Sequence, residues 1–126
     1  MKKNIISTSK APSAIGPYSQ AIEAGGFLFI SGQLGIDPET SEFVEGGIKG
    51  QTEQALKNIR NISQHAGYFL DNVIKTTVFM QDISMFADMN EVYSRYFTKE
   101  CPARSAIAVK GLPKNALVEI EVIAAK

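Results

Sequence analysis

Residues 27–34, Phe27-Leu28-Phe29-Ile30-Ser31-Gly32-Gln33-Leu34, form the stretch of sequence that decides the fold. Their aromatic and β-branched content predicts a strand, and Gly25-Gly26 directly before them predicts a tight hairpin turn. Alternation along a strand sorts the eight residues into two faces: Phe27, Phe29, Ser31 and Gln33 opposite Leu28, Ile30, Gly32 and Leu34. Because both sets contain large apolar side chains, we expect both faces of the sheet to be covered.

The sequence on either side of this strand predicts two helices and five further strands. Apolar residues at helical spacing predict a first helix from Ile48 to Ala66 that stops at Gly67, after an acidic loop at residues 37–47. A second helix, capped by Asp82 or Ser84, has an apolar stripe made of Phe86, Met89, Tyr93 and Tyr96 or Phe97. The other strands are expected around Ile5, before Gly25, at 73–80 with Ile74, Val78 and Met80 on one face, at 104–109 and at 116–125.

This order, β-β-β-α-β-α-β-β, predicts a single α+β domain over residues 1–126, since no repeat or linker interrupts it. Two helices cannot cover both faces of a six-stranded sheet. We therefore expect both helices on one face and a second subunit against the other, so that the protein is an oligomer.

Composition excludes several classes of function. The chain has 13 basic and 13 acidic residues, so it lacks the positive charge that attracts nucleic acids and anionic membranes. One His and one Cys cannot build a Cys/His zinc site, and one Cys cannot form an internal disulfide. No window approaches the ~18 apolar residues of a membrane span, and the first residues do not resemble a signal or transit peptide. The expectation is a cytoplasmic protein without metal or cofactor.

Arg104 is the most informative candidate site residue. Alternation in its strand places Arg104, Ala106 and Ala108 on one face, so small neighbours leave room for a partner over the guanidinium. A planar guanidinium pairs with a carboxylate through two parallel hydrogen bonds, although an ordinary edge-strand arginine has the same pattern. His65, near a helix end, and Cys101, on a loop, have no neighbours that indicate catalysis.

Two glutamates in the last strand are the candidate acid or base. Glu119 and Glu121 share a face opposite Val118, Ile120 and Val122, which is also the pattern of a solvent-facing strand. If strands 104–109 and 116–125 form a hairpin, one of these glutamates meets Arg104, and a glutamate that activates water beside a bound anion is a workable hydrolytic site.

Six motifs, spread in order through almost the whole chain, resemble those of the RidA/YjgF family: Ala14-Ile15-Gly16-Pro17-Tyr18-Ser19-Gln20, Ser31-Gly32-Gln33, Lys75-Thr76-Thr77-Val78-Phe79, Pro102-Ala103-Arg104-Ser105, Leu112-Pro113-Lys114 and Glu119-Ile120-Glu121. The resemblance implies a chorismate-mutase-like fold and a homotrimer whose sites lie between subunits. It also implies hydrolysis of 2-imino acids, such as 2-iminobutanoate and 2-iminopropanoate, that pyridoxal-phosphate enzymes release. Hydrolysis to 2-oxo acids and ammonia protects other enzymes from these reactive species.

The same resemblance implies the site residues. Arg104 matches the arginine that binds the substrate carboxylate, and Glu119 matches the acidic residue that positions or activates water. Other positions that match residues of the cleft are Tyr18, Ser31 with the Gly32 backbone, and Asn90. One position departs from the family: Ala106 stands where many members have a cysteine, so no role of that thiol carries over.

Two other functions stay open at this point. One is RNA cleavage or inhibition of translation, also known in this broad family, which the zero net charge and the lack of paired histidines disfavour. The other is a regulator that binds a 2-oxo acid or amino acid in the same cleft without turnover. The preferred imino acid, and the enzyme that supplies it, are not determined by the sequence.

Overall fold

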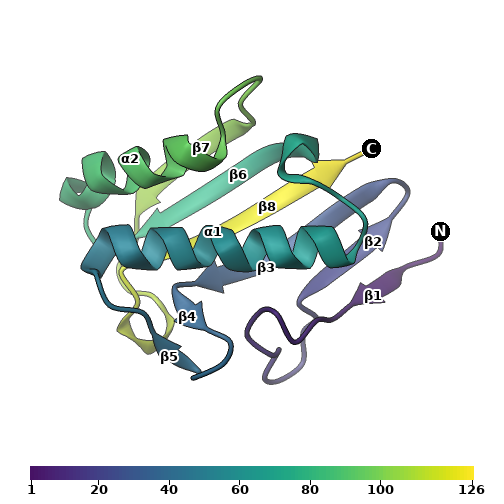
Figure 1. The fold of residues 1–126 in the computed structure, drawn as a ribbon, viewed down its shortest axis with the longest axis horizontal. Coiled ribbons are helices and arrows are strands. Elements are labelled where there is room, and N and C mark those ends of the chain that lie inside the picture. The colour runs from purple at the N-terminus through teal and green to yellow at the C-terminus, as the bar shows by residue number, and fades with distance from the viewer.

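The computed structural model describes residues 1–126 and has one six-stranded sheet with two helices on one of its faces (Figure 1). In spatial order the strands are β1 (Asn4–Ile6), β2 (Ala21–Ala24), β3 (Phe27–Leu34), β8 (Val118–Ala125), β6 (Val73–Met80) and β7 (Ala103–Ala108). The helices are α1 (Gly47–His65) and α2 (Phe86–Tyr96). The predicted α+β class, with both helices on one face, is confirmed. Neither helix is both long and apolar enough to cross a membrane.

The turn between β2 and β3 is the hairpin that the sequence predicts. Gly25 and Gly26 have φ values of 59° and 82°, and two consecutive positive φ angles are what a tight primed turn requires. Ala24 pairs directly with Phe27 across this turn. The predicted start of β3 is therefore correct.

A β-bulge in β3 corrects the predicted faces of this strand. The pairing with β8 is regular from Phe27 to Ile30 and shifts between Ile30 and Gln33. The additional residue reverses the alternation, because side chains beyond a bulge change face. Gln33 is consequently buried beside Leu28 and Ile30 on the helix side, and does not share the face of Phe27 and Phe29 as predicted.

A second register shift, in β6, corrects the position of Ile74. Val73 and Lys75 pair with adjacent residues of β8, so Ile74 is skipped and its side chain is 47% exposed. The prediction that Ile74 shares a face with the buried Val78 and Met80 is therefore wrong.

The last two strands do not form the predicted hairpin. β7 runs parallel to β6, while β8 runs antiparallel to β6 on its other side and also pairs with β3. The Val109 amide donates to the Met80 carbonyl and the Gln81 amide donates to the Leu117 carbonyl, so the chain leaves β7 and re-enters the sheet across β6. The connection between β7 and β8 is short, but β6 lies between these two strands in the sheet.

The core fills the space between the helices and the sheet. Apolar side chains of α1 and α2 meet the even-numbered residues of β8 and the buried face of β6, in a cluster that includes Leu56, Ile59, Ile62, Met89, Tyr93, Val78, Met80, Ile120 and Val122. Each fully buried aliphatic side chain contributes roughly 1.5–3 kcal/mol through loss of apolar surface from water. This burial explains why the apolar stripes of both helices are correctly predicted.

Two smaller features complete the architecture. The acidic segment predicted as a loop contains a small separate hairpin, β4 (Ile36–Asp37) with β5 (Glu42–Phe43). Asp82 accepts a hydrogen bond from the Ser84 amide and caps the 3-10 turn Ile83–Met85 that leads into α2, while α2 itself begins after Met85 without a side-chain cap, so the predicted cap lies one turn before the helix. Two further 3-10 turns span Leu70–Asn72 and Pro113–Asn115.

No helix covers the second face of the sheet, which we call the open face. Its apolar side chains include Phe27, Phe29 and Ile107, each between 43% and 46% exposed. Phe27 and Phe29 lie side by side, with ring centroids 6.2 Å apart. Covering of this face by another subunit stays a prediction.

Candidate active site

Arg104 lies on the edge strand β7 and points toward α2. It pairs with Thr76 of β6, whose side chain is on the helix side of the sheet. Its Nη1 donates to Oδ1 of Asn90 over 2.7 Å, so two residues predicted for the site are in contact. Its Cζ lies 4.8 Å from the ring centroid of Tyr93 and 5.3 Å from that of Phe86. These rings hold the cation on their faces, each contact contributing about 0.5–2 kcal/mol.

The positive charge of Arg104 has no anionic partner in the chain. The two ion pairs of the protein both involve Glu91, with Lys49 and Arg95. The only hydrogen bond of the guanidinium uses Nη1, which leaves the Nε and Nη2 edge free. That edge presents two parallel N–H groups, the geometry that binds a carboxylate.

Glu119 and Gly32 are in direct contact on the other side of the sheet. A Cβ atom added to Gly32 would lie 2.5 Å from Oε2 of Glu119, so this carboxylate packs on the Gly32 backbone as only glycine permits. Glu119 is half-buried, and burial raises the pKa of its carboxyl, with the neighbouring Glu121 charge as the smaller cause. A carboxyl with a raised pKa is suited to exchange protons near neutral pH.

Ser31 links this carboxylate to the segment that carries Tyr18. Ser31 Oγ donates to the Ser19 carbonyl over 2.6 Å, and its amide donates to the Gln20 carbonyl over 2.9 Å. Tyr18 itself is 54% exposed, and its hydroxyl accepts a hydrogen bond from the Ile15 amide. The predicted residues therefore divide into an arginine half, Arg104 with Asn90, and a glutamate half, Glu119 with Gly32, Ser31 and the Tyr18 segment.

Within one chain the two halves are apart. β6 lies between β7 and β8, so Arg104 and Glu119 are separated by at least two strand spacings, roughly 9.5 Å. Their side chains also leave opposite faces of the sheet, because Arg104 points to α2 and Glu119 to the open face. The predicted meeting of the two residues in one hairpin is wrong.

Sequence reasoning missed two members of the arginine half, Phe86 and Tyr93. Both were assigned to the apolar stripe of the second helix, and Tyr93 is indeed buried there. The signal that could have found them is the spacing: Phe86, Asn90 and Tyr93 follow i, i+4, i+7, so one amide interrupts an apolar face. A polar group at the centre of such a stripe needs a partner, which here is Arg104.

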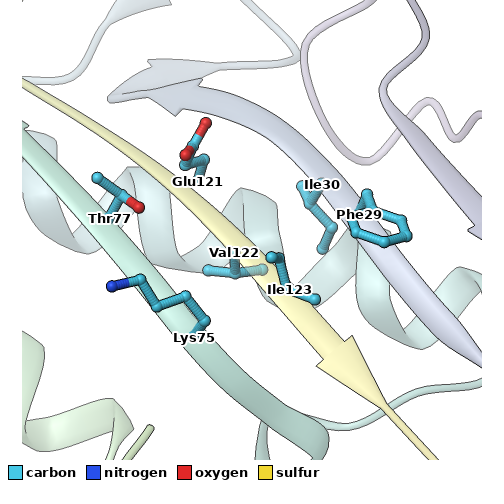
Figure 2. A pocket seen from close by; sticks show the side chains of 7 residues that line it. All are labelled: Phe29, Ile30, Lys75, Thr77, Glu121, Val122 and Ile123. Atoms are coloured by element: carbon cyan, nitrogen blue, oxygen red, sulfur yellow. The ribbon is translucent and has the colours of Figure 1, made fainter. Parts of the chain in front are cut away.

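A pocket of about 160 Å³ lies on the open face, on the side of the glutamate half, since Glu121 in its lining is the neighbour of Glu119 (Figure 2). Figure 2 shows side chains from three adjacent strands around it: Phe29, Ile30, Lys75, Thr77, Glu121, Val122 and Ile123. Glu121, the alternative to Glu119 in the sequence, belongs to this pocket.

The remaining candidates lie elsewhere. His65 lines a polar pocket at the end of α1 with Thr8, Lys10, Asn61 and Gln64, and Cys101 is an exposed thiol that donates weakly to the Phe97 carbonyl. No group of three or more His, Cys, Asp or Glu side chains is arranged to hold a metal ion.

Several known proteins are similar to this chain over almost its whole length. A family model described as endoribonuclease L-PSP matches residues 8–126. A RutC family protein of Pyrococcus horikoshii is 57% identical over 124 residues, 98% of each chain. The human 2-iminobutanoate/2-iminopropanoate deaminase is 48% identical over 122 residues, which are 97% of this chain and 89% of the relative. The crystal structure of Escherichia coli TdcF with bound serine has a TM-score of 0.93 at 40% identity, covering 98% of both chains.

Proposed function

The chain belongs to the RidA/YjgF family, and from this premise we propose that it is a deaminase of 2-imino acids, with 2-iminobutanoate and 2-iminopropanoate as the substrate type. The observation that carries the proposal is the Arg104 guanidinium, which is exposed, unpaired with any carboxylate, and supported by two aromatic rings. The similarity to the human 2-iminobutanoate/2-iminopropanoate deaminase supports the same substrate class.

The guanidinium selects the carboxylate that every 2-imino acid carries. Its free Nε and Nη2 edge makes two charge-assisted hydrogen bonds to that group, each worth about 1.5–3 kcal/mol. Asn90 holds Nη1, so the plane of the guanidinium is set before the substrate arrives. The rigid fork therefore orients the imine carbon, which lies one bond from the carboxylate.

The chemical step adds one water to the imine carbon. The new C–O bond forms as the C=N electron pair moves to nitrogen, and Glu119 accepts a proton from the attacking water. The same carboxyl returns that proton to the nitrogen and gives a carbinolamine. It then carries the hydroxyl proton to the nitrogen, so that the C=O bond forms as the C–N bond breaks and the 2-oxo acid and ammonia leave. Burial suits Glu119 to this exchange, because it raises the pKa of the carboxyl toward the working pH.

The reaction needs both halves of the site, and we propose that two copies of the chain supply them. The arginine half faces α2 and the glutamate half faces the open side, so the surfaces that meet differ from one another. A contact between different surfaces is heterologous, and it generates a ring such as a trimer where the rotation between copies closes. The homotrimer implied by the family resemblance satisfies this condition.

Replacement of Arg104 by Lys tests the carboxylate site. Lys keeps the positive charge but has no planar fork, so we expect Arg104→Lys to lose at least about 100-fold in kcat/KM, close to the loss in Arg104→Ala. Steady-state rates of ammonia release from 2-iminobutanoate generated in situ give the measurement, with semicarbazide as the competing trap. Arg95→Lys is the matched control, since Arg95 lies on the exposed surface of α2 and pairs only with Glu91. Wild-type rates in Arg104→Lys would remove the proposed role.

Cleavage of RNA is the second candidate, and the description of the matching family model favours it. The chain has equal numbers of basic and acidic residues, and its single histidine lies at the far end of α1. Retention on RNA at physiological salt, with a steep loss as salt rises, would support this activity over the deaminase.

Binding without turnover is the third candidate, because a relative has been solved with bound serine. Tight binding of 2-oxobutanoate together with no acceleration of imine decay would identify a ligand-binding regulator and contradict the deaminase.

A further inference from the structure

A buried hydrogen bond lies directly beneath the arginine half. Thr76 Oγ1 and the Tyr93 hydroxyl share it at 2.8 Å, with either oxygen able to donate. Thr76 is 0% exposed and Tyr93 is 5% exposed, so neither group can exchange this partner for water. Each of these buried hydroxyls therefore keeps a hydrogen-bond partner only while the other residue stays in its place.

The bond joins the two elements that hold Arg104. Thr76 is the residue of β6 that pairs with Arg104 of β7, and Tyr93 is the residue of α2 whose ring lies 4.8 Å from the Arg104 Cζ. The three residues thus form a triangle in which the strand fixes the tyrosine hydroxyl and the tyrosine ring carries the guanidinium. Phe97 packs against the same ring, with the two ring centroids 4.7 Å apart.

We propose that Tyr93, anchored by Thr76, is a positioning residue that holds the Arg104 guanidinium in the orientation that binds the substrate carboxylate. The inference rests on the deaminase proposed above and adds residues to its site. A free arginine side chain samples many rotamers, and a site that must order it on binding loses affinity. A ring fixed at both ends removes that cost before the substrate arrives.

Phe86 has a lesser part in the same arrangement. Its ring lies 5.3 Å from the Arg104 Cζ and is only half-buried, near the start of α2. It has no hydroxyl to anchor it to the sheet. Tyr93 is therefore the residue on which the orientation depends, and Phe86 confines the guanidinium from a second side.

The test compares Tyr93→Leu, which removes ring and hydroxyl, with Tyr93→Phe, which keeps the ring. We expect Tyr93→Leu to raise the KM for 2-iminobutanoate about tenfold or more, with a smaller change in kcat. Tyr93→Phe keeps the ring but loses the Thr76 anchor, so it should show part of that rise. The inhibition constant of 2-oxobutanoate should rise in parallel. Phe86→Leu, at a more exposed position, should shift both constants in the same direction and keeps the test usable if Tyr93→Leu folds poorly.

Tyr96→Leu is the matched control. Tyr96 also lies on α2, its hydroxyl donates to Glu53 over 3.1 Å, and its ring faces Arg60 at 5.7 Å, so it copies the environment of Tyr93 away from Arg104. A purely structural role would lower the active fraction, and hence kcat, alike in Tyr93→Leu and Tyr96→Leu with KM unchanged. That pattern would overturn the inference.

A readout without turnover separates this inference from the proposed function. The Nε–H signal of Arg104 in side-chain NMR, assigned by its absence in Arg104→Lys, reports how firmly the guanidinium is held. A signal that is sharp in the wild type, broader in Tyr93→Phe and broadest in Tyr93→Leu supports the positioning role even if no imine is hydrolysed. An equally sharp signal in Tyr93→Leu contradicts it, whatever the activity of the wild type.

Discussion

At the scale of single residues, the environment of each ionisable group decides its chemistry. Glu119 and Asp82 are both carboxyls at strand or helix ends, yet burial raises the pKa of Glu119 while the Ser84 hydrogen bonds lower the pKa of Asp82. Without their surroundings, these two carboxyl groups would titrate in the same pH range. The difference suits Glu119 to the proton exchange that we propose, whereas Asp82 stays charged to lower pH as a cap.

The raised pKa of Glu119 predicts how stability depends on pH. The folded state holds this proton more tightly than the unfolded state, so the group's stabilising effect is present below the unfolded pKa, about 4.3, and is lost as pH rises through the folded pKa. Glu119→Gln should therefore be more stable than the wild type at pH 7, and the difference should vanish near pH 3.

Urea unfolding across this pH range measures the effect, and Asp82→Asn is a control of opposite sign. The lowered pKa of Asp82 gives stability that is present at neutral pH and lost as pH falls, so Asp82→Asn should be the less stable protein at pH 7. If Glu119→Gln is instead less stable than the wild type at neutral pH, the ionised Glu119 carboxylate stabilises the folded state, and the prediction is wrong.

At the scale of elements, the bulge in β3 shapes the glutamate half. It lies between Ile30 and Gln33, so Ser31 and Gly32 are free of the regular ladder at the place where Glu119 packs. Bulges often direct a side chain next to a functional site. Here the bulge turns Gln33 inward and leaves the Gly32 backbone bare beneath the carboxylate.

Gly32→Ala tests this arrangement. The backbone of Gly32 tolerates a side chain, but the new Cβ would lie 2.5 Å from Glu119 Oε2 and would push the carboxylate away. We expect deaminase kcat to fall at least about tenfold while unfolding changes far less, because only the placement of Glu119 is altered. Gly111→Ala is the control, since nothing lies within 4 Å of a Cβ there. If Gly32→Ala is as active as the wild type, the exact position of the Glu119 carboxylate does not matter for activity, and the prediction is wrong.

The order of elements also contained a signal that was misread. β6, α2 and β7 follow one another as strand, helix and strand, a succession that favours parallel pairing through a crossover. The short connection from β7 to β8 favoured a hairpin instead. Two local rules competed, and the crossover prevailed because α2 must pack on the sheet through Met89 and Tyr93.

At the scale of the whole molecule, the open face and the divided site point to the same assembly. Phe27, Phe29 and Ile107 remain on the surface of the single chain, and neither half of the site is complete without the other. In the assembly that we propose, burial of the apolar face and completion of the site occur together.

Mixing two inactive variants tests a site shared between copies. Arg104→Ala keeps the glutamate half and Glu119→Gln keeps the arginine half, so mixed rings contain some sites with both native halves. Random exchange in equal amounts should restore about a quarter of wild-type activity, because each half is native with even odds. The measurement is ammonia release after co-refolding, with each variant refolded alone as control. No recovery in verified mixed oligomers would place both halves in one chain.

The sequence by itself determined the two helices with their apolar stripes and the six strands of the main sheet, because helical and strand periodicities are local and burial enforces them. It also determined the family, since six motifs in order leave little freedom. Features that depend on distant segments could not be predicted from the sequence. These are the two register shifts, the central position of β8 in the sheet, and the aromatic rings beneath Arg104. One inserted residue in a ladder reverses every later side chain, and no local pattern records it. Only the packed sheet decided that Arg104 and Glu119 leave opposite faces, which is the physical reason for our proposal that two copies of the chain share each site.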